Sequence, residues 1–525
     1  MKGKLFIAGI ALLAVAACNK PSELKPVNPT DGDQYMAVNL KMSGSASTKA
    51  WDAEAFENAT DEEIAVAKAQ FLFFNGDTQC ADIYIPEEEL KWGEPDHQDS
   101  DQKKADAIIV LENPTAIPTS IVAILNTDVN LAGKKLSELT SLTDFQAIEG
   151  KFVMSNSVYV DGGEVVIGTP VTEENICKSK DEALQAPVEI HVERVLAKVE
   201  LDAQNASQDA DSKAVDSEGK EIVVKIDGFW LDNTNPKANL IKSLAADALE
   251  GDWWYDAANF RSYWAKSVEG NLDRAAWKDA TMDAKYVNEN TPAIADVLSD
   301  ADDSENHAAT QIVFATHLEI GGAPADVVKY LSTYYTLDNW KIYVANTLGK
   351  YYTKTEGDGT TTEAIYNKIT AADLTFDIAT GEVENPSYSA PASYGNNENI
   401  EAWEAVITVS CDKDLYLADG TAATFEAKKY KVQYFKDGKS YFYAPIRHND
   451  IDALDADKKP ADGYYGIVRN HLYRVKATKI YGLGTPVPDP GQIIVPIKPI
   501  ETESYIAAEI DVLKYKVVEN EYELK

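Results

Sequence analysis

The stretch that decides the fold runs from Pro187 to Asp202 and reads Pro-Val-Glu-Ile-His-Val-Glu-Arg-Val-Leu-Ala-Lys-Val-Glu-Leu-Asp. Apolar residues alternate with polar ones up to Val192 and again from Val195 onwards, but the second set lies in the opposite phase. Alternation with a period of two is typical of a β-strand that buries one face. A one-residue β-bulge at Glu193/Arg194 would bring both sets onto one core, so this stretch predicts a single bulged strand.

Similar short segments fill most of the chain on either side of this stretch. The sequence contains 27 tyrosines and 9 tryptophans, and such residues with turn formers between them favour short strands over helical bundles. The predicted fold class is therefore mostly β. Strands are expected at residues 69–75, 106–112, 119–127, 151–160, 164–171, 221–231, 406–410, 430–435, 440–444 and 471–481, and helices at residues 136–147, 239–249 and 362–369.

Length and charge restrict the function. The chain has 525 residues, of which 45% are apolar and 26% charged, a balance typical of folded proteins with roughly two to four domains. Its 86 acidic residues outnumber the 49 basic ones, which gives a net charge of -37. Because like charges repel, a nucleic-acid backbone and an anionic membrane surface are excluded as partners.

The first residues form a targeting segment. Lys2 and Lys4 precede an apolar run at residues 5–17 that is too short to span a bilayer as a helix. The run ends in Val-Ala-Ala-Cys, which matches the lipobox of bacterial lipoproteins. We therefore predict a signal peptide at residues 1–17, export, and lipidation of Cys18, palmitate included. An ordinary signal peptide that ends by chance in cysteine is the alternative.

A strand with one buried face is expected at residues 35–42, Tyr-Met-Ala-Val-Asn-Leu-Lys-Met. Small flexible residues follow at 43–48 and lead to Lys49 and Ala50, and a trypsin-like protease draws such a loop into its cleft. We predict cleavage between Lys49 and Ala50, which would remove the strand. The residues that share its apolar face are Met36, Val38, Leu40 and Met42.

The carboxyl end repeats this pattern after a long spacer. Residues 485–504 contain five prolines and, at about 3.1 Å per residue, would reach about 60 Å. Residues 505–512, Tyr-Ile-Ala-Ala-Glu-Ile-Asp-Val, then align with residues 35–42 position by position. If the first copy is cut away, the tail of a second molecule can enter its groove by β-strand addition, and we expect the tail to be free before that. The predicted inward residues of this donor strand are Ile506, Ala508, Ile510 and Val512.

The chain lacks the usual signs of catalysis. Cys80, Cys177 and Cys411 allow at most one disulfide, and neither they nor the six histidines have the spacing of a metal site. Residues 300–306 resemble a calcium loop without its glycine and are interpreted as a solvated acidic loop. We predict no cofactor, no metal and no enzymatic activity, and a surface hydrolase that uses a pair of carboxylates is the third hypothesis.

A Trp/Tyr-rich segment at about residues 239–400 leaves two interpretations open. Aromatic side chains in such numbers more often fill a core than line a ligand groove, and we favour the core. The competing hypothesis is a surface glycan-binding lipoprotein, in which these rings stack on sugars. That hypothesis explains the lipobox, but it gives no role to the matching end strands or to Lys49.

Taken in order, several motifs resemble the lipoprotein-derived pilins of the Bacteroidales, the type V pili, and most closely the stalk subunit of the minor fimbriae. The resemblance covers nearly the whole chain, and the spacer and terminal strand fit it as well. Its motifs are the lipobox at Cys18, Phe-Val-Met-Ser-Asn at 152–156, Val-Glu-Arg-Val-Leu-Ala-Lys-Val at 192–199, Arg-Ser-Tyr-Trp at 261–264, Tyr-Val-Asn-Glu-Asn-Thr at 286–291, Val-Arg-Asn-His-Leu-Tyr at 468–473 and Gly-Leu-Gly at 482–484.

The resemblance implies two transthyretin-like β-sandwich domains, at residues 50–212 and 213–484, the second with a mixed α/β insertion at about 239–400. Residues 18–49 would be a propeptide, and residues 485–525 the spacer and donor strand. The resemblance further implies surface transport, trypsin-like cleavage, and polymerisation by donor-strand exchange into fimbriae on the outer membrane that serve adhesion or biofilm formation. Partners would be other copies, tip and anchor subunits, and a host or bacterial receptor. The family's usual cut follows arginine, so Lys49 leaves the identity of the protease open.

Overall fold

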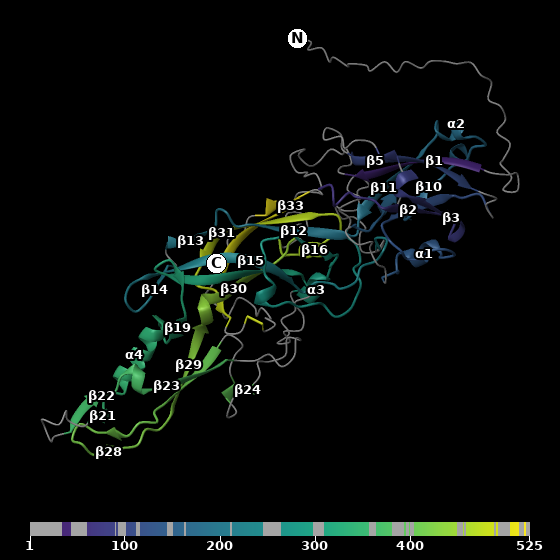
Figure 1. Ribbon diagram of the computed structural model, residues 1–525. Coiled ribbons are helices and arrows are strands. Elements are labelled where there is room, and N and C mark those ends of the chain that lie inside the picture. The colour runs from purple at the N-terminus through teal and green to yellow at the C-terminus, as the bar shows by residue number, and fades with distance from the viewer. Residues whose placement is uncertain are drawn as a thin grey trace, which may run out of the picture.

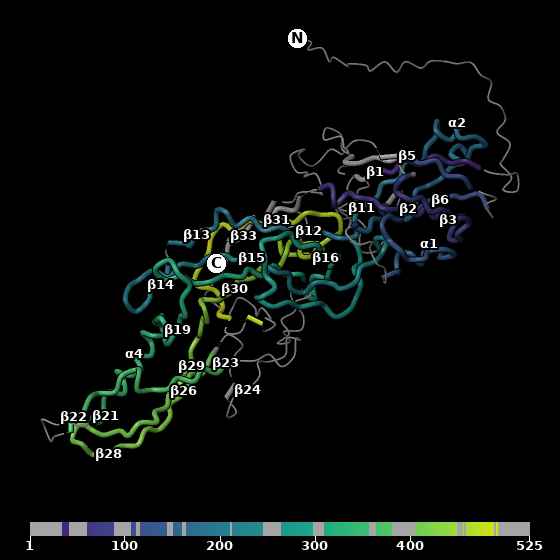
Figure 2. The backbone as a smooth tube through the Cα atoms, in the orientation of Figure 1, coloured from purple at the N-terminus to yellow at the C-terminus, as the bar shows by residue number. Residues whose placement is uncertain are grey.

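The protein is described here by a computed structural model, whose ribbon and backbone trace are shown in Figure 1 and Figure 2. Strands dominate, which confirms the predicted mostly β class. Within the described part, no helix is long and apolar enough to cross a membrane. The structure describes residues 34–43, 60–89, 91–92, 101–111, 116–143, 151–161, 164–210, 213–244, 264–297, 309–355, 364–380, 393–394, 398–399, 404–448, 455, 458–487, 490–491, 505–513 and 519–520.

The first unit is built on one sheet that buries both of its faces. Phe71 and Phe73 pack into the core on one face, whereas Leu72 and Phe74 pack into the core on the other. Two short helices, α1 (Leu136–Leu139) and α2 (Lys180–Ala183), accompany the sheet. In sheet order the strands are β3 (Thr78–Pro86), β2 (Lys68–Asn75), β6 (Ser120–Leu125), β7 (Met154–Asn156), β11 (Val188–Arg194), β1 (Gln34–Ser43), β5 (Asp101–Leu111) and β4 (Lys91–Trp92), with β10 (Thr169–Pro170) beside β6.

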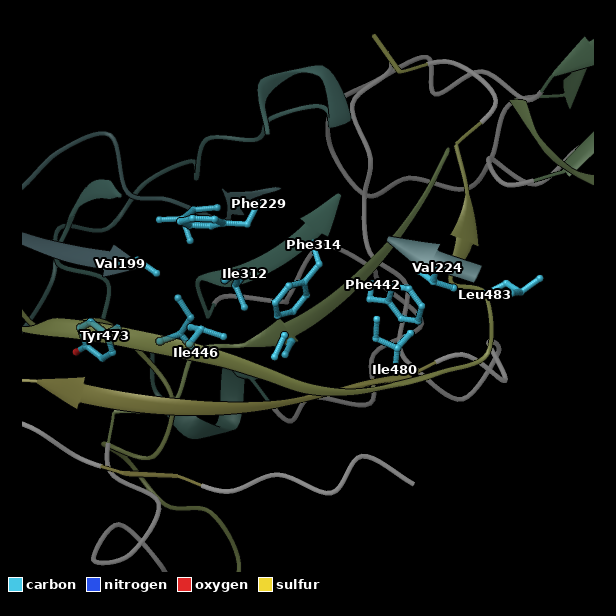
Figure 3. Close-up of a cluster of buried hydrophobic side chains, with 14 of the residues drawn as sticks. Val199, Val224, Phe229, Ile312, Phe314, Phe442, Ile446, Tyr473, Ile480 and Leu483 are labelled. Atoms are coloured by element: carbon cyan, nitrogen blue, oxygen red, sulfur yellow. The ribbon is translucent and has the colours of Figure 1, made fainter. Parts of the chain in front are cut away.

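The second unit has two sheets that close over one core, drawn in Figure 3. Val199 and Tyr473 reach this core from the first sheet, and Phe314 and Phe442 reach it from the second. The first sheet has the order β16 (Lys285–Asn288), β12 (Leu196–Asp202), β31 (Leu472–Tyr481), β33 (Tyr505–Leu513) and β34 (Glu519–Asn520), with β13 (Ser207–Gln208) beside β31. The second has the order β14 (Ala214–Val215), β15 (Glu221–Asp232), β17 (Gln311–Ile320), β30 (Lys439–Pro445) and β32 (Thr485–Pro486), with β18 (Ala323–Pro324) beside β17.

The third unit has its own core around Trp340 of α4 (Leu337–Thr347). Trp340 is fully buried, and the rings of Tyr330, Phe376 and Tyr430 meet it edge-on at centroid distances of 6.2, 6.1 and 5.5 Å. These aromatic residues fill a core, as the favoured interpretation expects. The sheets are β20 (Thr333–Thr336), β19 (Val327–Tyr330), β29 (Lys428–Phe435), β26 (Glu404–Ser410) and β23 (Thr375–Thr380), and, separately, β22 (Ile365–Lys368), β21 (Tyr352–Thr355), β27 (Leu415–Tyr416) and β28 (Ala422–Ala423).

Short elements complete the described part. Each has only two to four residues. They are the strands β8 (Tyr159–Asp161), β9 (Glu164–Val166), β24 (Ser393–Tyr394) and β25 (Glu398–Asn399), the helix α3 (Ile294–Val297), and the 3-10 helices at Glu87–Glu89, Glu173–Asn175, Trp277–Asp279, Ala371–Asp373 and Lys436–Gly438.

The structure corrects the single bulged strand predicted at residues 187–202. Strand β11 ends at Arg194 and β12 begins at Leu196, and the two strands belong to different sheets. The first apolar set packs into the core of the first unit, whereas Ala197 and Val199 pack into the core of the second. The change of phase therefore marks the crossing from one unit to the next. This crossing lies upstream of the polar run near residue 212, where the sequence suggested a boundary.

Two predicted helices are also wrong. Of the helix predicted at 239–249, residues 239–244 are not helical and take part in the joint described below, whereas residues 245–249 lie outside the described residues. Residues 365–368 form β22, since they pair with β21. At 136–147, only Leu136–Leu139 is helical in the described part, and residues 144–147 lie outside it. The acidic loop at 300–306 also lies outside the described residues.

The sequence missed β17 and misplaced the insertion. Strand β17 lies inside the segment predicted as an insertion, yet it pairs with both β15 and β30 in the second unit. Strands β26 and β29, which were expected to belong to the second sandwich, instead form part of the sheet of the third unit. A buried strand with little alternation gives no period-two signal, and Gln-Ile-Val-Phe-Ala at residues 311–315 is such a sequence.

Candidate assembly site

Strand β1 lies in the middle of the first sheet, between two long neighbours. It pairs antiparallel with β5 from Gln34 to Ser43 and parallel with β11 from Val38 to Met42. We call the space that β1 occupies between β5 and β11 the slot. Of the predicted face, Met36, Val38 and Leu40 are 0%, 1% and 0% exposed. Met42 stands opposite Val192 in the register, and its side chain lies outside the described residues.

The residues around the slot are themselves apolar. Met36 is in register with Ile109 of β5, and Val38 and Leu40 are in register with Val188 and Ile190 of β11. Burying three such side chains is worth about 4.5–9 kcal/mol, before any backbone hydrogen bond is counted. Loss of β1 would therefore expose apolar surface and leave two strand edges without a partner, a combination that invites another strand.

Backbone hydrogen bonds to Cys177 hold the start of β1 in place. The amide nitrogen of each of Tyr35 and Cys177 donates a hydrogen bond to the carbonyl oxygen of the other, both at 2.8 Å. Cys80, Cys177 and Cys411 are not in disulfides, and each is partly buried. Burial raises the pKa of the Cys80 and Cys177 thiols, so both favour the neutral form.

The predicted lipidation residue Cys18 and cleavage residues Lys49 and Ala50 lie outside the described residues. Downstream of them, the chain is held at Glu63, whose carboxylate accepts hydrogen bonds from the Thr60 amide at 2.7 Å and the Tyr286 hydroxyl at 2.6 Å. Lys198 of β12 lies 3.0 Å from the same carboxylate. Burial opposes the charge of Glu63, but these partners prevail and lower its pKa.

The carboxyl-terminal strand is not free, contrary to the prediction. Strand β33 pairs antiparallel with β31 of its own chain along its whole length, and we call this position of the tail, residues 505–513, the home seat. The β31 residues opposite the predicted donor residues are all 2% exposed or less. The pairs are Ile506 with Ile480, Ala508 with Ala477, Ile510 with Val475 and Val512 with Tyr473, with a bulge between Ala477 and Lys479.

The first part of the predicted spacer is fixed to the second unit. Strand β32 pairs with β30, and Val487 is 2% exposed and packs near Trp230. The Val487 amide donates to the Lys439 carbonyl at 3.0 Å, and the Lys278 amide donates to the Pro490 carbonyl at 3.0 Å. The rest of the predicted spacer, residues 492–504, lies outside the described residues.

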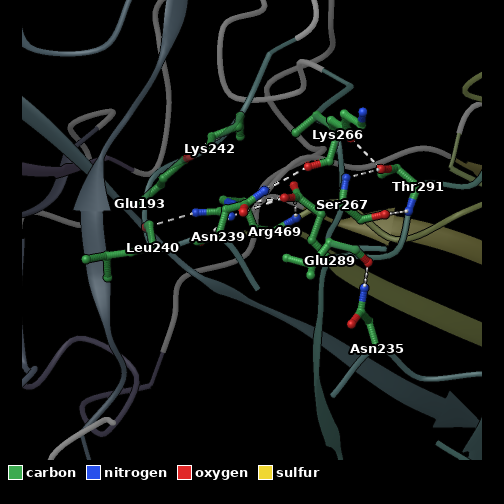
Figure 4. A network of polar contacts seen from close by, with 12 residues as sticks. Glu193, Asn235, Asn239, Leu240, Lys242, Lys266, Ser267, Glu289, Thr291 and Arg469 are labelled. Carbon is green, nitrogen blue, oxygen red and sulfur yellow. Dashed lines mark hydrogen bonds and ion pairs between the residues drawn. The ribbon is translucent and has the colours of Figure 1, made fainter. Parts of the chain in front are cut away.

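A buried polar network joins the first and second units (Figure 4). Lys242 lies 3.1 Å from Glu193 of β11, and both side chains are fully buried. Arg469, before β31, contacts Glu289 at 3.2 Å and donates to the carbonyl oxygen of Asn239 at 2.7 Å. Burial raises the pKa of Glu193, and the nearby cations oppose that rise. The two units therefore meet through buried polar contacts, with Glu193 on β11 and Arg469 just before β31.

Four of the seven motifs of the resemblance meet at this joint, although sequence reasoning gave their charged residues no role. Glu193, Glu289 and Arg469 come from the motifs at 192–199, 286–291 and 468–473. Phe152, from the motif at 152–156, packs against Tyr286 with ring centroids 4.7 Å apart. Motifs far apart in the chain share one location, which a single sequence cannot reveal.

Comparisons with known proteins match part of the chain to fimbrial subunits. Residues 433–521 match the model of the family described as major fimbrial subunit protein type IV, fimbrillin, C-terminal. The chain is 33% identical over 145 residues to a major fimbrium subunit FimA type-2 of Porphyromonas gingivalis, which covers 27% of this chain and 30% of that protein. A type-3 subunit of the same organism is 32% identical over 145 residues, with the same coverage. The match thus spans about a third of these relatives' length.

Solved structures of similar proteins include a fimbrilin (FimA) of Porphyromonas gingivalis, at 13% identity and a TM-score of 0.37, covering 91% of this chain and 96% of that one. The tip fimbrial protein Mfa3 of the same organism has 11% identity and a TM-score of 0.32, covering 91% and 99%.

Residues 433–521 are thus similar to the carboxyl-terminal part of fimbrial subunit proteins, and a segment of 145 residues is similar to FimA subunits. The predicted resemblance to the lipoprotein-derived fimbrial subunits of the Bacteroidales is confirmed. The relatives named above are major fimbrium subunits, so the assignment to the stalk of the minor fimbriae stays a prediction. Among the described residues, no group of His, Cys, Asp and Glu is arranged to hold a metal ion.

Proposed function

We propose that this protein is a structural subunit of a surface fimbria that polymerises by donor-strand exchange. The observation that carries the proposal is the position of β1. A strand that is central and buried also lies directly upstream of the segment with Lys49 and Ala50. One proteolytic cut there would convert a filled sheet into an open slot.

In this proposal the precursor is exported and lipidated at Cys18, and a trypsin-like protease cuts between Lys49 and Ala50. Residues 18–49 leave, and the slot loses Met36, Val38, Leu40 and Met42. The tail of a neighbouring copy then inserts Ile506, Ala508, Ile510 and Val512. Before cleavage, β1 occupies the slot at a high effective concentration within the same chain, which an incoming tail cannot match.

The home seat adds a step that the sequence did not suggest. Because β33 pairs with β31, a tail must leave its own molecule before it enters another. Assembly then exchanges one strand pairing for a better one, since the slot offers two long neighbours, whereas β33 has β31 on one side and only the short β34 on the other. The Glu63 contacts support the same scheme, because they keep the chain downstream of the cut attached to β12 and β16.

Electron microscopy of the purified precursor, with and without limited trypsin, tests the proposal. We expect fibres only after cleavage, with their number rising as residues 1–49 are lost. Fibres of equal number from the intact precursor would contradict the proposal. Lipidation is tested separately by metabolic labelling with a fatty acid, where Cys18→Ala should abolish incorporation and Cys177→Ala should not.

The subunit would serve adhesion or biofilm formation together with other copies, tip and anchor subunits. The glycan-binding alternative gains no support from the third unit, because Trp340 is fully buried there and Tyr330 and Tyr430 pack around it.

A further inference from the structure

The tail and β1 carry apolar residues at matching positions, but their polar residues differ in charge. The alignment of Tyr505 with Tyr35 puts Glu509 at the position of Asn39 and Asp511 at the position of Lys41. The neighbours of these two positions differ between the home seat and the slot. They therefore decide which seat is favoured electrostatically.

In the home seat, the acidic positions of the tail are in register with basic residues of β31. The register sets Glu509 opposite Lys476 and Asp511 opposite Arg474. Arg474 also lies 3.3 Å from Glu200 of β12. Opposite charges at directly opposed positions of antiparallel strands stabilise the pairing. Both acidic residues of the tail thus favour its own molecule.

In the slot, the two positions have opposite surroundings. Asn39 lies between Asp106 of β5 and Glu189 of β11. Lys41 lies between Lys104 and His191 of the same strands. A tail in the slot would therefore bring Glu509 between two acids, where like charges destabilise the pairing, and Asp511 beside a lysine and a histidine.

We infer that Glu509 is the specificity-determining residue that sets the balance between the home seat and the slot. It is in register with Lys476 in the home seat, and in the slot it would be in register with Asp106 and Glu189. Opposite charges at paired positions favour the home seat, and like charges disfavour the slot, so Glu509 should slow the transfer of the tail on both counts. Asp511 faces opposite charge in both seats, so its contributions largely cancel. This inference rests on the proposed function, since it concerns the tail as a donor strand.

Shifting the tail along the slot either loses apolar packing or leaves an acidic residue between Asp106 and Glu189. Moving it by two residues in one direction places Ala508 at the position of Leu40, which is fully buried, and leaves a cavity. Moving it by two residues in the other direction places Asp511 at the position of Asn39, again between Asp106 and Glu189. The unshifted register keeps the best apolar fit and retains the repulsion.

The test compares four variants of the full precursor after limited trypsin. Glu509→Gln removes the attraction at home and the repulsion in the slot. Lys476→Gln removes the attraction at home, and Glu189→Gln removes part of the repulsion in the slot together with the contact of Glu189 with His191 at 3.0 Å. Asp511→Asn is the matched control with the same change of charge. Each opposed pair is worth a factor of about 1.4–5 in an equilibrium, so we expect polymerisation roughly tenfold faster for Glu509→Gln and about threefold faster for each single-seat variant.

Two further measurements distinguish effects on the home seat from effects on the slot. Amide hydrogen exchange of residues 472–481 in the uncleaved precursor reports release from the home seat, and it should speed up in Glu509→Gln and Lys476→Gln but not in Glu189→Gln. At 0.5 M salt the differences in rate should shrink, because screening weakens all of these pairs.

The outcomes distinguish the inference from the proposed function. Normal fibres from wild type, with Glu509→Gln assembling at the wild-type rate, would overturn the inference and leave the function intact. Equal acceleration by Asp511→Asn would also overturn it, because net charge rather than position would then matter. If cleaved wild type forms no fibres, the proposed function fails and the inference fails with it.

Discussion

Strands β1 and β33 share an apolar pattern but occupy seats of very different strength. Strand β1 has a neighbour on each side, with β5 along its whole length and β11 along half of it. Strand β33 has β31 on one side and only the short β34 on the other. The alternation of apolar residues determines which strands can replace one another. The position of a strand in its sheet determines how firmly it is held. We expect β1 to leave only when the chain is cut, and β33 to detach reversibly.

The largest effect in this comparison should come from Lys49→Ala. With the cut prevented, β1 stays in the slot, and the precursor should remain a monomer even when its tail leaves β31. The measurement is size-exclusion chromatography and electron microscopy after trypsin, with the amino terminus verified by mass spectrometry. As a control, Lys49→Arg should polymerise like wild type.

If an intact Lys49→Ala chain formed fibres at the wild-type rate, β1 would not be the strand that blocks assembly before cleavage. The difference in seat strength between β1 and β33 would then have no role in assembly.

Ile510→Asp should have the next largest effect, because it places a charge among the predicted inward residues of the tail. Burying an unpaired carboxylate costs several kcal/mol, so extension of fibres should be abolished after cleavage. In the home seat the same change stands opposite Val475, and we expect faster hydrogen exchange in β31 but little change in the melting temperature of the precursor. Strand β31 keeps β12 as its other neighbour.

Asp511→Asn, one position along, is the matched control and should be nearly silent in both measurements. Equal loss of assembly in the two variants would show that residues 505–513 do not alternate between an inward and an outward face.

Glu63→Gln tests why the chain downstream of the cut stays in place when β1 leaves. Hydrogen bonds to a charged group are worth about 1.5–3 kcal/mol, and the amide loses the charge pair with Lys198. We expect unfolding of the cleaved chain to be easier by about that amount at pH 7. The pKa of Glu63 is lowered, so its stabilisation is present above the ordinary pKa of 4.5 and is lost as the pH falls through the lowered pKa.

Denaturant unfolding of wild type and Glu63→Gln between pH 3 and 7 checks this sign. The difference between the two chains should shrink toward acid pH. A difference that grows as the pH falls would contradict the assigned role of the Glu63 carboxylate.

The sequence predicts the strand class and the apolar face of β1, because both depend on a local period of two. It does not reveal which sheet a strand joins, as the segment from Val188 to Val199 illustrates. Its change of phase fits a bulge and a crossing between sheets equally well, and only the partners of β11 and β12 decide between them. The home seat of the tail was missed for the same reason, since the alternation of residues 505–513 does not reveal that β31 is their partner strand.

The joint was missed for a different reason. Lys242 and Glu193 are 49 positions apart, and Arg469 and Glu289 are 180 positions apart. A fully buried charge looks like any surface charge in a single sequence, until its partner is known. The motifs of the resemblance located this site without explaining it.

The smallest effect we expect is that of salt on the cleaved wild type. Removal of residues 1–49 takes away six basic and three acidic residues, so the net charge changes from -37 to -40 and the copies repel one another. The pairs that hold the tail in its home seat are also electrostatic, so screening both reduces repulsion between copies and loosens the tail. Assembly itself depends on apolar burial and main-chain pairing, which salt leaves intact.

Raising sodium chloride from 0.05 to 0.5 M should therefore speed polymerisation a few-fold, as followed by light scattering, while the midpoint of thermal unfolding changes little. Strong inhibition by 0.5 M salt would mean that attraction between charges drives the contact between copies, and that the apolar match between β1 and β33 is not what joins them.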